Sequence, residues 1–228
     1  MHKVSCITVT KNRLSLLKTS IKHFNSQTHS NKEMIIVYYN TDKETRNWIS
    51  DNIDSLNSQN IMPYMFVEDD GLNLGTIRNY AVSKATGEWL CIWDDDDYYR
   101  EDRISEQLKF CIENNTDACT LKSVLIYSNK MQEVKLSFER FEGWEGSLLC
   151  RSESMPKYKN LKKGEDTPVV NFLIENNNLK TMFNPDLYVY IFHDNNISGD
   201  RHKEELLDNS LELSVNKIRE IKEKIGWL

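Results

Sequence analysis

Four consecutive aspartates, Asp94 to Asp97, follow directly after a short apolar run, Trp89 to Trp93. The run predicts a buried strand, so the acids are expected at its carboxyl end, the edge where open α/β sheets bind ligands. Two like charges about 4 Å apart repel by about 4 kcal/mol at an effective dielectric near 20, and a bound divalent cation reverses that cost. Hard cations such as Mn²⁺ or Mg²⁺ prefer carboxylate oxygens and often also hold substrate phosphates. The cluster therefore predicts a metal site, with a solvated acidic turn as the alternative.

The elements that position these acids are indicated by hydrophobic periodicity. Short runs rich in β-branched and apolar residues predict strands over residues 4–10, 34–39, 64–67 and 89–93. Apolar residues at helical spacing predict helices over residues 14–24, 45–58, 73–85 and 101–114. Strands that alternate with helices imply right-handed β-α-β units, and therefore an α/β fold with a mostly parallel, Rossmann-like sheet flanked by helices.

The pattern changes after residue 118. Residues 118–127 and 133–138 predict two strands that pair with each other in antiparallel fashion. A helix is expected over residues 167–175 and a late strand over residues 187–192. This part of the chain therefore predicts an antiparallel portion added to the parallel sheet.

The last stretch of the chain predicts a long amphipathic helix. Its apolar residues share one stripe at helical spacing, namely Leu207, Leu211, Val215, Ile218, Ile221, Ile225 and Leu228. Three uses of this stripe remain open: docking on the rest of the domain, pairing with a second copy as a homodimer, or contact with a membrane surface. The opposite face mixes lysine and arginine with glutamate, which argues against the membrane.

Composition bounds the function classes. The chain of 228 residues is 39% hydrophobic and 28% charged, as expected of a globular protein, and its net charge of −6 argues against nucleic-acid binding. No apolar run approaches the length of a membrane span, and the N-terminus lacks a signal-peptide core. The five cysteines are widely spaced and are interpreted as reduced packing residues. We therefore expect a cytoplasmic protein, peripheral at a membrane at most.

Five short segments stand in a fixed order along the chain. They are Thr10-Lys11-Asn12-Arg13, residues 73–79 (Asn-Leu-Gly-Thr-Ile-Arg-Asn), Gly87-Glu88 followed by the strand and the aspartates, Gly164-Glu165-Asp166, and His193. In this order the chain resembles the family 2 glycosyltransferases of GT-A fold, whose pattern includes an Asp-x-Asp motif after a strand and a later Glu-Asp pair. The resemblance covers roughly residues 3–195. Each motif is weak alone, and the ordered set is specific.

The resemblance implies a fold, an activity and a division of the chain. It implies a single GT-A domain over residues 1–200, with a donor half (1–117) and an acceptor half (118–200), followed by the amphipathic helix over residues 201–228. The implied activity is inverting transfer of a sugar from a nucleotide-diphosphate sugar to a hydroxyl of a glycan, lipid-linked or protein acceptor. The Gln-x-x-Arg-Trp motif of processive synthases is absent, which favours addition of one sugar.

The resemblance also assigns the acids and one histidine. Asp96 matches the principal ligand of a Mn²⁺ or Mg²⁺ ion, with Asp94 directed towards the ribose or the metal. Asp95 is then placed near the hydroxyls of the donor sugar. His193 matches a histidine that completes the metal shell in some GT-A enzymes, with a surface-loop histidine as the alternative. For Asp97, capping of the following helix is an equal alternative to a site role.

Further donor-binding residues lie at the ends of other elements. Thr10, Asn12 and Arg13 follow the first strand, where a base or a ribose would bind, and simple turn formation is an equal alternative for Thr10 and Asn12. Arg78 is suited to a phosphate or a carboxylate, which it meets with two parallel hydrogen bonds, or to a structural bridge into the acidic cluster.

The chain departs from the family pattern after the second strand. Where the family has acids, one of which recognises the base, this chain has Tyr38-Tyr39-Asn40-Thr41, and Asp42 is shifted downstream. Tyr39 or its neighbour Tyr38 is therefore expected to stack on the base. This departure leaves the identity of the donor nucleotide open.

On the acceptor side, Asp166 matches the base that removes the proton of the attacking hydroxyl. The alternative is a helix N-cap, since Pro168 falls in the first turn. Glu165 is expected to orient the acceptor. Trp144 and Glu145 are expected to bind it, because aromatic faces stack on sugar rings, although Trp144 is equally consistent with a core residue.

Two rival functions are weighed against glycosyl transfer. A nucleotidyltransferase that makes nucleotide sugars predicts a glycine-rich loop after the first strand, but no glycine precedes Gly71. A non-catalytic module that binds nucleotides or glycans would explain the altered residues after the second strand.

Overall fold

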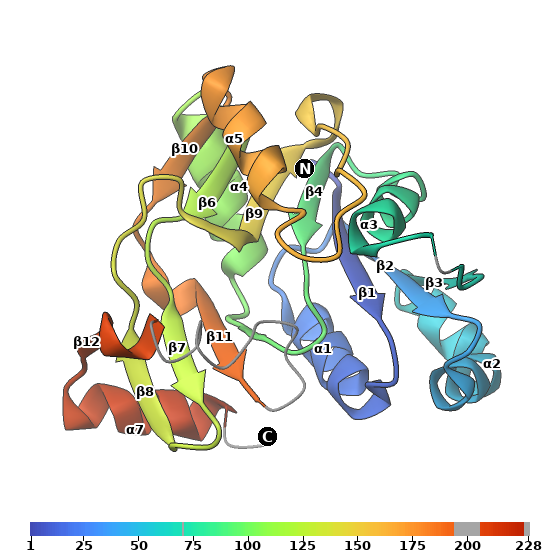
Figure 1. Ribbon diagram of the computed structural model, residues 1–228, viewed down its shortest axis with the longest axis horizontal. Coiled ribbons are helices and arrows are strands. Elements are labelled where there is room, and N and C mark those ends of the chain that lie inside the picture. Colours follow the sequence, from blue (N-terminus) through green and yellow to red (C-terminus); the bar gives the residue numbers. More distant parts are fainter. Residues whose placement is uncertain (70, 194–205, 226–228) are drawn as a thin grey trace.

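A computed structural model describes residues 1–69, 71–193 and 206–225 of the chain. These residues form two β-sheets with helices packed against them (Figure 1). The α/β architecture expected from the sequence, with a mostly parallel sheet between helices, is confirmed.

The larger sheet has seven strands in the order β10-β6-β9-β4-β1-β2-β3. Their bounds are β1 Val4–Thr10, β2 Lys32–Tyr39, β3 Ile61–Phe66, β4 Trp89–Ile92, β6 Ala118–Leu121, β9 Trp144–Arg151 and β10 Leu179–Met182. Strands β3, β2, β1 and β4 are parallel, whereas β9 is antiparallel to β4 and to β6. The four parallel strands therefore end at one edge, where the aspartates follow β4.

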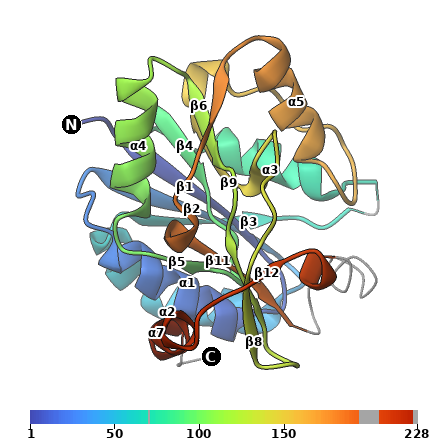
Figure 2. The same cartoon turned by 90° about the vertical axis from the view of Figure 1, so that its left-hand side faces the viewer.

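Helices cover both faces of this sheet, and Figure 2 shows α4 and α5 on opposite sides of the strands. Their bounds are α1 Leu14–Ser26, α2 Lys43–Ser58, α3 Leu74–Val82, α4 Arg103–Glu113 and α5 Thr167–Glu175. In β2, Met34 and Ile36 pack in the cluster with α1, α2 and α4, whereas Ile35 and Val37 pack in the cluster with α3 and α5. Consecutive residues of the strand are apolar because both of its faces are buried, which is typical of a parallel sheet.

The smaller sheet has five strands in the order β12-β8-β7-β11-β5. Their bounds are β5 Tyr98–Tyr99, β7 Leu125–Ser128, β8 Glu133–Leu136, β11 Tyr188–Phe192 and β12 Leu211–Glu212, and the 3₁₀ helices are η1 Ser152–Ser154 and η2 Pro185–Leu187. Because β5 begins directly after the four aspartates, the acidic turn carries the chain from the larger sheet to the smaller one.

One expectation for the region after residue 118 needs correction, and two strands there were missed. The single strand expected over residues 118–127 is two strands, β6 and β7, which belong to different sheets. The antiparallel pairing of β7 with β8 is confirmed. Strands β9 and β10 were not expected from the sequence. β9 begins with Trp-Glu-Gly and continues as a short apolar run, so it lacks the alternation that marks a half-buried strand.

The long C-terminal helix expected from the apolar stripe is wrong in its extent. Leu211 lies in β12, and the helix α7 runs only over Val215–Ile225. Ile221 and Ile225 are buried in a cluster with β7, β8 and β11, and Ile218 packs against it. Ile218, Ile221 and Ile225 therefore dock on the smaller sheet. Leu207 is buried in the largest core cluster instead, Leu211 and Val215 are exposed, and Leu228 lies outside the described residues. No described helix has both the length and the apolar character needed to cross a membrane.

Truncation of Ile221 is expected to destabilise the protein. Its side chain is buried in the cluster beneath α7, and large-to-small substitution of a buried isoleucine typically costs about 2–5 kcal/mol. Ile221→Ala should lower the free energy of unfolding by that amount in urea titrations. Val215→Ala is the matched control, since Val215 is 72% exposed on the same helix and should change stability by less than about 0.5 kcal/mol. Equal effects of both substitutions would contradict the docking of α7.

Candidate functional site

The ends of β1 and β4 lie side by side and bring the first loop against the acidic turn. The Thr10 hydroxyl donates a hydrogen bond of 2.6 Å to Asp95 Oδ2, and Arg13 Nη1 lies 3.2 Å from Asp95 Oδ1. Asp95 is only 3% exposed, and burial first, then the charge of Asp96, raises its pKa to about 7. This placement favours a role for Asp95 in fixing the turn over direct contact with the donor sugar.

Asp97 joins the acidic turn to the smaller sheet. Its carboxylate accepts hydrogen bonds from the Tyr188 hydroxyl and, at 2.9 Å, from the Ile191 amide. Burial raises the pKa of Asp97 well above its usual range. The capping alternative for Asp97 is wrong, because the N-cap position of α4 is occupied by Asp102. Tyr188 was not singled out from the sequence, since a tyrosine in a buried strand is usually a packing residue.

Asp96 and His193 form the part of the turn that is suited to a metal. His193 Nε2 lies 3.0 Å from Asp96 Oδ2, and Arg13 Nη1 lies 2.9 Å from the same oxygen. Burial opposes ionisation of Asp96, but the hydrogen bond with His193 and the charge of Arg13 hold its pKa below the usual range. An ionised carboxylate beside an imidazole is a donor pair that Mn²⁺ accepts.

The predicted trio of metal ligands is not assembled in one place. Among the described residues, no three side chains of His, Cys, Asp or Glu are arranged to hold a metal ion. Asp94 Oδ1 instead lies 3.0 Å from Arg78 Nη2. Mg²⁺ and similar ions are held by as few as one or two protein carboxylates where substrate phosphates supply further oxygens, so the ionised Asp96 suits such an ion without Asp94.

Arg78 connects the acidic turn with the second pair of acids. Its Nε lies 3.0 Å from Glu165 Oε1 and 3.6 Å from Asp166 Oδ1, while its Nη2 contacts Asp94. Burial disfavours the charged guanidinium, but the carboxylates, with Asp166 first, raise the pKa of Arg78 well above its usual value. Its Nη1 is buried and has no hydrogen-bond partner among the described residues. One guanidinium therefore contacts three carboxylates, and its Nη1 remains available to donate a further hydrogen bond.

Asp166 lies directly before α5 and has the environment of a base. Its side chain makes no capping hydrogen bond to the helix, so the N-cap alternative is not supported by a contact. Burial raises the pKa of Asp166 to about 7, although the charge of Arg78 opposes this. Its carboxylate is 24% exposed, so it remains accessible from the solvent. By contrast, Glu165 is buried against Arg78, which favours a role in holding Arg78 over direct contact with an acceptor.

The residues expected to bind the acceptor divide into a core residue, Trp144, and a half-buried residue, Glu145. Trp144 is 6% exposed and packs against Phe138 and Tyr190, which favours the core alternative. Glu145 accepts a hydrogen bond of 3.0 Å from the Thr167 hydroxyl, next to Asp166, so it lies close to the candidate base.

The Asn-Leu-Gly-Thr-Ile-Arg-Asn segment at the start of α3 holds the loop that leads to Asp166. The Asn79 side-chain amide exchanges two hydrogen bonds with the Tyr158 backbone, at 2.8 and 2.9 Å. The Asn73 backbone N–H donates to Asn160 Oδ1 at 2.9 Å. A side chain at Gly75 would place its Cβ 1.9 Å from the Lys159 carbonyl oxygen, so only glycine allows this close approach. This segment therefore holds the loop that leads to Asp166, and it also supplies Arg78.

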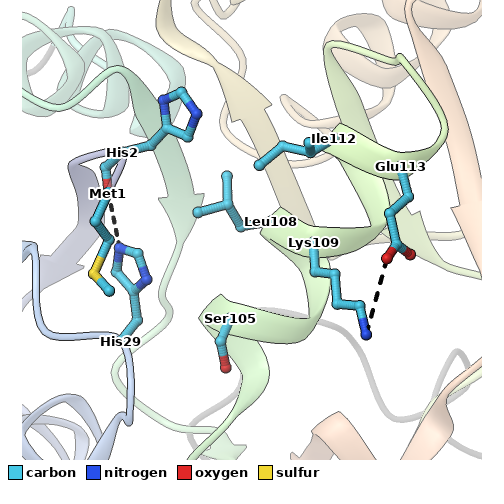
Figure 3. Close-up of a pocket in the computed structure, with 8 residues that line it drawn as sticks. All are labelled: Met1, His2, His29, Ser105, Leu108, Lys109, Ile112 and Glu113. Atoms are coloured by element: carbon cyan, nitrogen blue, oxygen red, sulfur yellow. Dashed lines mark hydrogen bonds and ion pairs between the residues drawn. The ribbon is translucent and has the colours of Figure 1, made fainter.

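A separate pocket of about 360 Å³ lies at the opposite end of β1 (Figure 3). It is formed by the N-terminal Met1 and His2 together with His29 and one side of α4. His29 Nε2 lies 2.9 Å from the His2 carbonyl oxygen. Because it lies beside the residues that precede β1, this pocket is remote from the edge that carries the aspartates.

Comparison with known sequences bears on this site. Residues 5–174 match the family model described as Glycosyl transferase family 2. An uncharacterized glycosyltransferase of Rickettsia bellii is 31% identical over 113 residues, which are 50% of this chain and 16% of that protein. One from Rickettsia felis is 30% identical over 113 residues, or 50% of this chain and 18% of that protein. The chain thus spans only a small part of the length of these curated relatives.

Solved structures show the same fold. TarS of S. aureus in complex with UDP superposes with a TM-score of 0.66 at 17% identity, covering 90% of this chain and 69% of that chain. The mannosyltransferase PcManGT from Pyrobaculum calidifontis, in complex with GDP-Man and Mn²⁺, gives a TM-score of 0.63 at 15% identity, covering 91% and 62%. This likeness confirms the GT-A fold that was expected from the sequence.

Proposed function

Because this chain belongs to glycosyl transferase family 2, we propose that it moves one sugar from a nucleotide-diphosphate sugar to an acceptor hydroxyl, with inversion and with a divalent metal. The observation that carries the proposal is the buried Arg78, which contacts Asp94 on one side and the Glu165–Asp166 pair on the other. It holds a donor-side acid and a candidate base in one site, as a single displacement requires.

On the donor side, Asp96 and His193 would hold the metal, Mn²⁺ or Mg²⁺, together with oxygens of the diphosphate. The bound metal would act as a Lewis acid that neutralises the departing diphosphate. Arg13 brings a further positive charge to Asp96, at 2.9 Å, and is therefore expected to face the same leaving group.

On the acceptor side, Asp166 would take the proton of the attacking hydroxyl. Its pKa of about 7, raised by burial, suits a base that works near neutral pH. As the new carbon–oxygen bond forms, the bond from the anomeric carbon to the diphosphate breaks, and the proton remains on Asp166. Attack from the side opposite the leaving group inverts the anomeric configuration.

The wider assignments follow from the same proposal. Residues 1–117 would bind the donor, since they supply the four parallel strands and the acidic turn. Residues 118–200 would bind the acceptor, and they would also supply His193 to the metal. The acceptor would be a glycan, lipid-linked or protein hydroxyl, and no role with nucleic acid is proposed. A cytoplasmic location, with peripheral contact at a membrane, stays a prediction, as does a homodimer.

The decisive experiment measures donor hydrolysis without an acceptor, because many transferases slowly pass the sugar to water. UDP-GlcNAc, UDP-Glc and GDP-Man should be tested with Mn²⁺, with Mg²⁺ and with EDTA, and the anomer released should be identified by NMR. We expect at least one donor to be cleaved with inversion, and EDTA to stop the reaction. Full activity in EDTA would overturn metal dependence, and retention would overturn the single displacement. Binding of a donor without any cleavage would favour the non-catalytic module.

A further inference from the structure

The ends of β1, β2 and β3 meet at a corner of the sheet edge that the proposed chemistry leaves unused. Lys11 follows β1, Thr41 lies two residues after β2, and Glu68 lies two residues after β3. Lys11 is next to Thr10, whose hydroxyl is bonded to Asp95 of the acidic turn. A nucleoside whose diphosphate binds at that turn would therefore have its base within reach of this corner.

Asp42, the acid nearest to the end of β2, is already committed to the fold. Its Oδ2 accepts a hydrogen bond of 2.6 Å from the Asn12 backbone amide. Its Oδ1 accepts one of 3.1 Å from the Thr45 backbone amide, so Asp42 caps the start of α2. Asp42 is also only 1% exposed. A carboxylate that is buried against backbone amides is closed to a ligand, so a more exposed acid is the better candidate to meet a base.

Glu68 has the position and the charge for that task. Its Oε1 contacts Lys11 Nζ, and its Oε2 accepts a hydrogen bond of 2.6 Å from the Thr41 hydroxyl. The Glu68 amide donates to Asn40 Oδ1 at 2.9 Å, which ties β3 to the loop after β2. Hydrogen bonds from Lys11 and Thr41 lower the pKa of Glu68, so it is ionised at neutral pH. Its side chain is 32% exposed, which leaves it open to a ligand.

Aromatic side chains form the wall beside this charged pair. Tyr39 and Phe66 end β2 and β3, are paired in register, and have ring centroids 6.4 Å apart. Tyr80 from α3 adds a third ring, 5.2 Å from Phe66, and Lys11 Nζ lies 4.8 Å from the centre of the Tyr39 ring. Half-buried aromatic rings next to polar groups are the combination that holds planar bases, because every base has an apolar face and a polar edge.

We propose that Glu68 and Lys11 recognise the nucleobase of the donor, in place of the acid that is missing after β2. Glu68 accepts a hydrogen bond from a ring N–H of the base, and Lys11 donates one to the neighbouring carbonyl oxygen of the base. Tyr39 contacts the face of the base. The base enters between the two charged groups, which exchange part of their mutual contact for contacts to it. This inference rests on the proposed function and names its substrate class more closely.

The chemistry selects bases that carry a ring N–H beside a carbonyl group. Uracil, thymine and guanine have that edge. Cytosine and adenine present an unprotonated ring nitrogen there, which a carboxylate repels. A site built to accept a hydrogen bond discriminates strongly, because the wrong ligand leaves its buried or partly buried group unpaired.

The test is calorimetric binding of UDP, dTDP, GDP, CDP and ADP in the presence of Mn²⁺. Among UDP, dTDP and GDP, we expect the tightest ligand to bind with at least about tenfold higher affinity than CDP and ADP. This is the effect of losing one hydrogen bond to a charged group. The comparison among the first three then distinguishes uracil, thymine and guanine. Equal affinity for CDP or ADP would overturn the inference. Binding of none of the five would overturn the proposed donor as well, so the two failures are distinct.

Glu68→Gln separates recognition from a structural role. The amide keeps the size of the side chain but is neutral and offers a donor, so the preferred nucleotide should lose about tenfold in affinity while CDP loses little or gains. Glu44→Gln is the matched control, since Glu44 is an exposed residue in the first turn of α2 and should alter no affinity. Equal weakening of all five nucleotides by Glu68→Gln would mean that Glu68 only holds the loops.

Discussion

Asp96→Asn is expected to abolish sugar transfer and to weaken binding of the nucleotide sugar at the same time. Asp96 Oδ2 is 3.0 Å from His193 Nε2, and loss of its charge removes half of the proposed protein contribution to the metal. Metal neutralisation of a leaving group is worth several kcal/mol, so turnover should fall by about 10³-fold. The measurement is the turnover number and the donor dissociation constant, both at saturating Mn²⁺.

A matched neutralisation elsewhere controls for the change in net charge. Asp54 is exposed on α2, remote from the acidic turn, and Asp54→Asn should transfer sugar at the wild-type rate. Binding of Mn²⁺ in the presence of nucleoside diphosphate, followed by electron paramagnetic resonance, gives a readout that does not depend on activity. Normal turnover of Asp96→Asn would refute the metal assignment for this residue.

Asp166→Asn is expected to stop turnover and leave donor affinity nearly intact. The amide retains the shape of the side chain but cannot take a proton, and a positioned general base contributes about 10²–10⁴-fold. Asp166 lies on the acceptor side of Arg78, 3.6 Å from its Nε, so donor binding should change by less than threefold, about 0.6 kcal/mol. Single-turnover rates and donor titrations separate the two quantities.

The control for this substitution lies at the other end of the same helix. Glu175 is the last residue of α5 and is exposed, so Glu175→Gln should affect neither turnover nor donor binding. If Asp166→Asn weakens the donor as strongly as it slows transfer, Asp166 acts through the structure of the site and another group is the base.

The pH dependence of transfer should report the same base. Burial raises the pKa of Asp166 to about 7. Because the base acts when deprotonated, the rate should be low at pH 5, rise about tenfold per pH unit below the pKa, and level off above pH 7. Asp95 also has a pKa raised to about 7 by burial, so the wild-type profile alone does not identify the group. Loss of the pH-dependent limb in the residual activity of Asp166→Asn, with the limb kept in wild type, assigns it to Asp166.

The sequence by itself determined the alternation of strands and helices in the first half, because apolar periodicity depends only on which faces of each element are buried. It therefore also determined that Thr10, Tyr39 and the four aspartates lie at one edge, since parallel strands end together. Strands β1, β2 and β4 and helix α5 agree with the expected bounds within about two residues.

What the sequence left undecided depends on contacts between residues far apart in the chain. The four aspartates are the same residue type, so the local sequence does not distinguish their roles. Only packing decides that Asp97 contacts Tyr188, that Asp95 contacts Thr10 and that Asp94 contacts Arg78. The split of residues 118–127 between two sheets has the same cause, because a short apolar run fits either sheet and local pattern carries no information about its partner.

The tertiary structure alone placed Glu68 beside Lys11 and assigned Asp42 to a helix cap. Both are acids near strand ends, and composition does not distinguish them. Their roles differ because a carboxylate buried against backbone amides is saturated, whereas one that remains partly exposed at the junction of three strands keeps its charge available to a ligand.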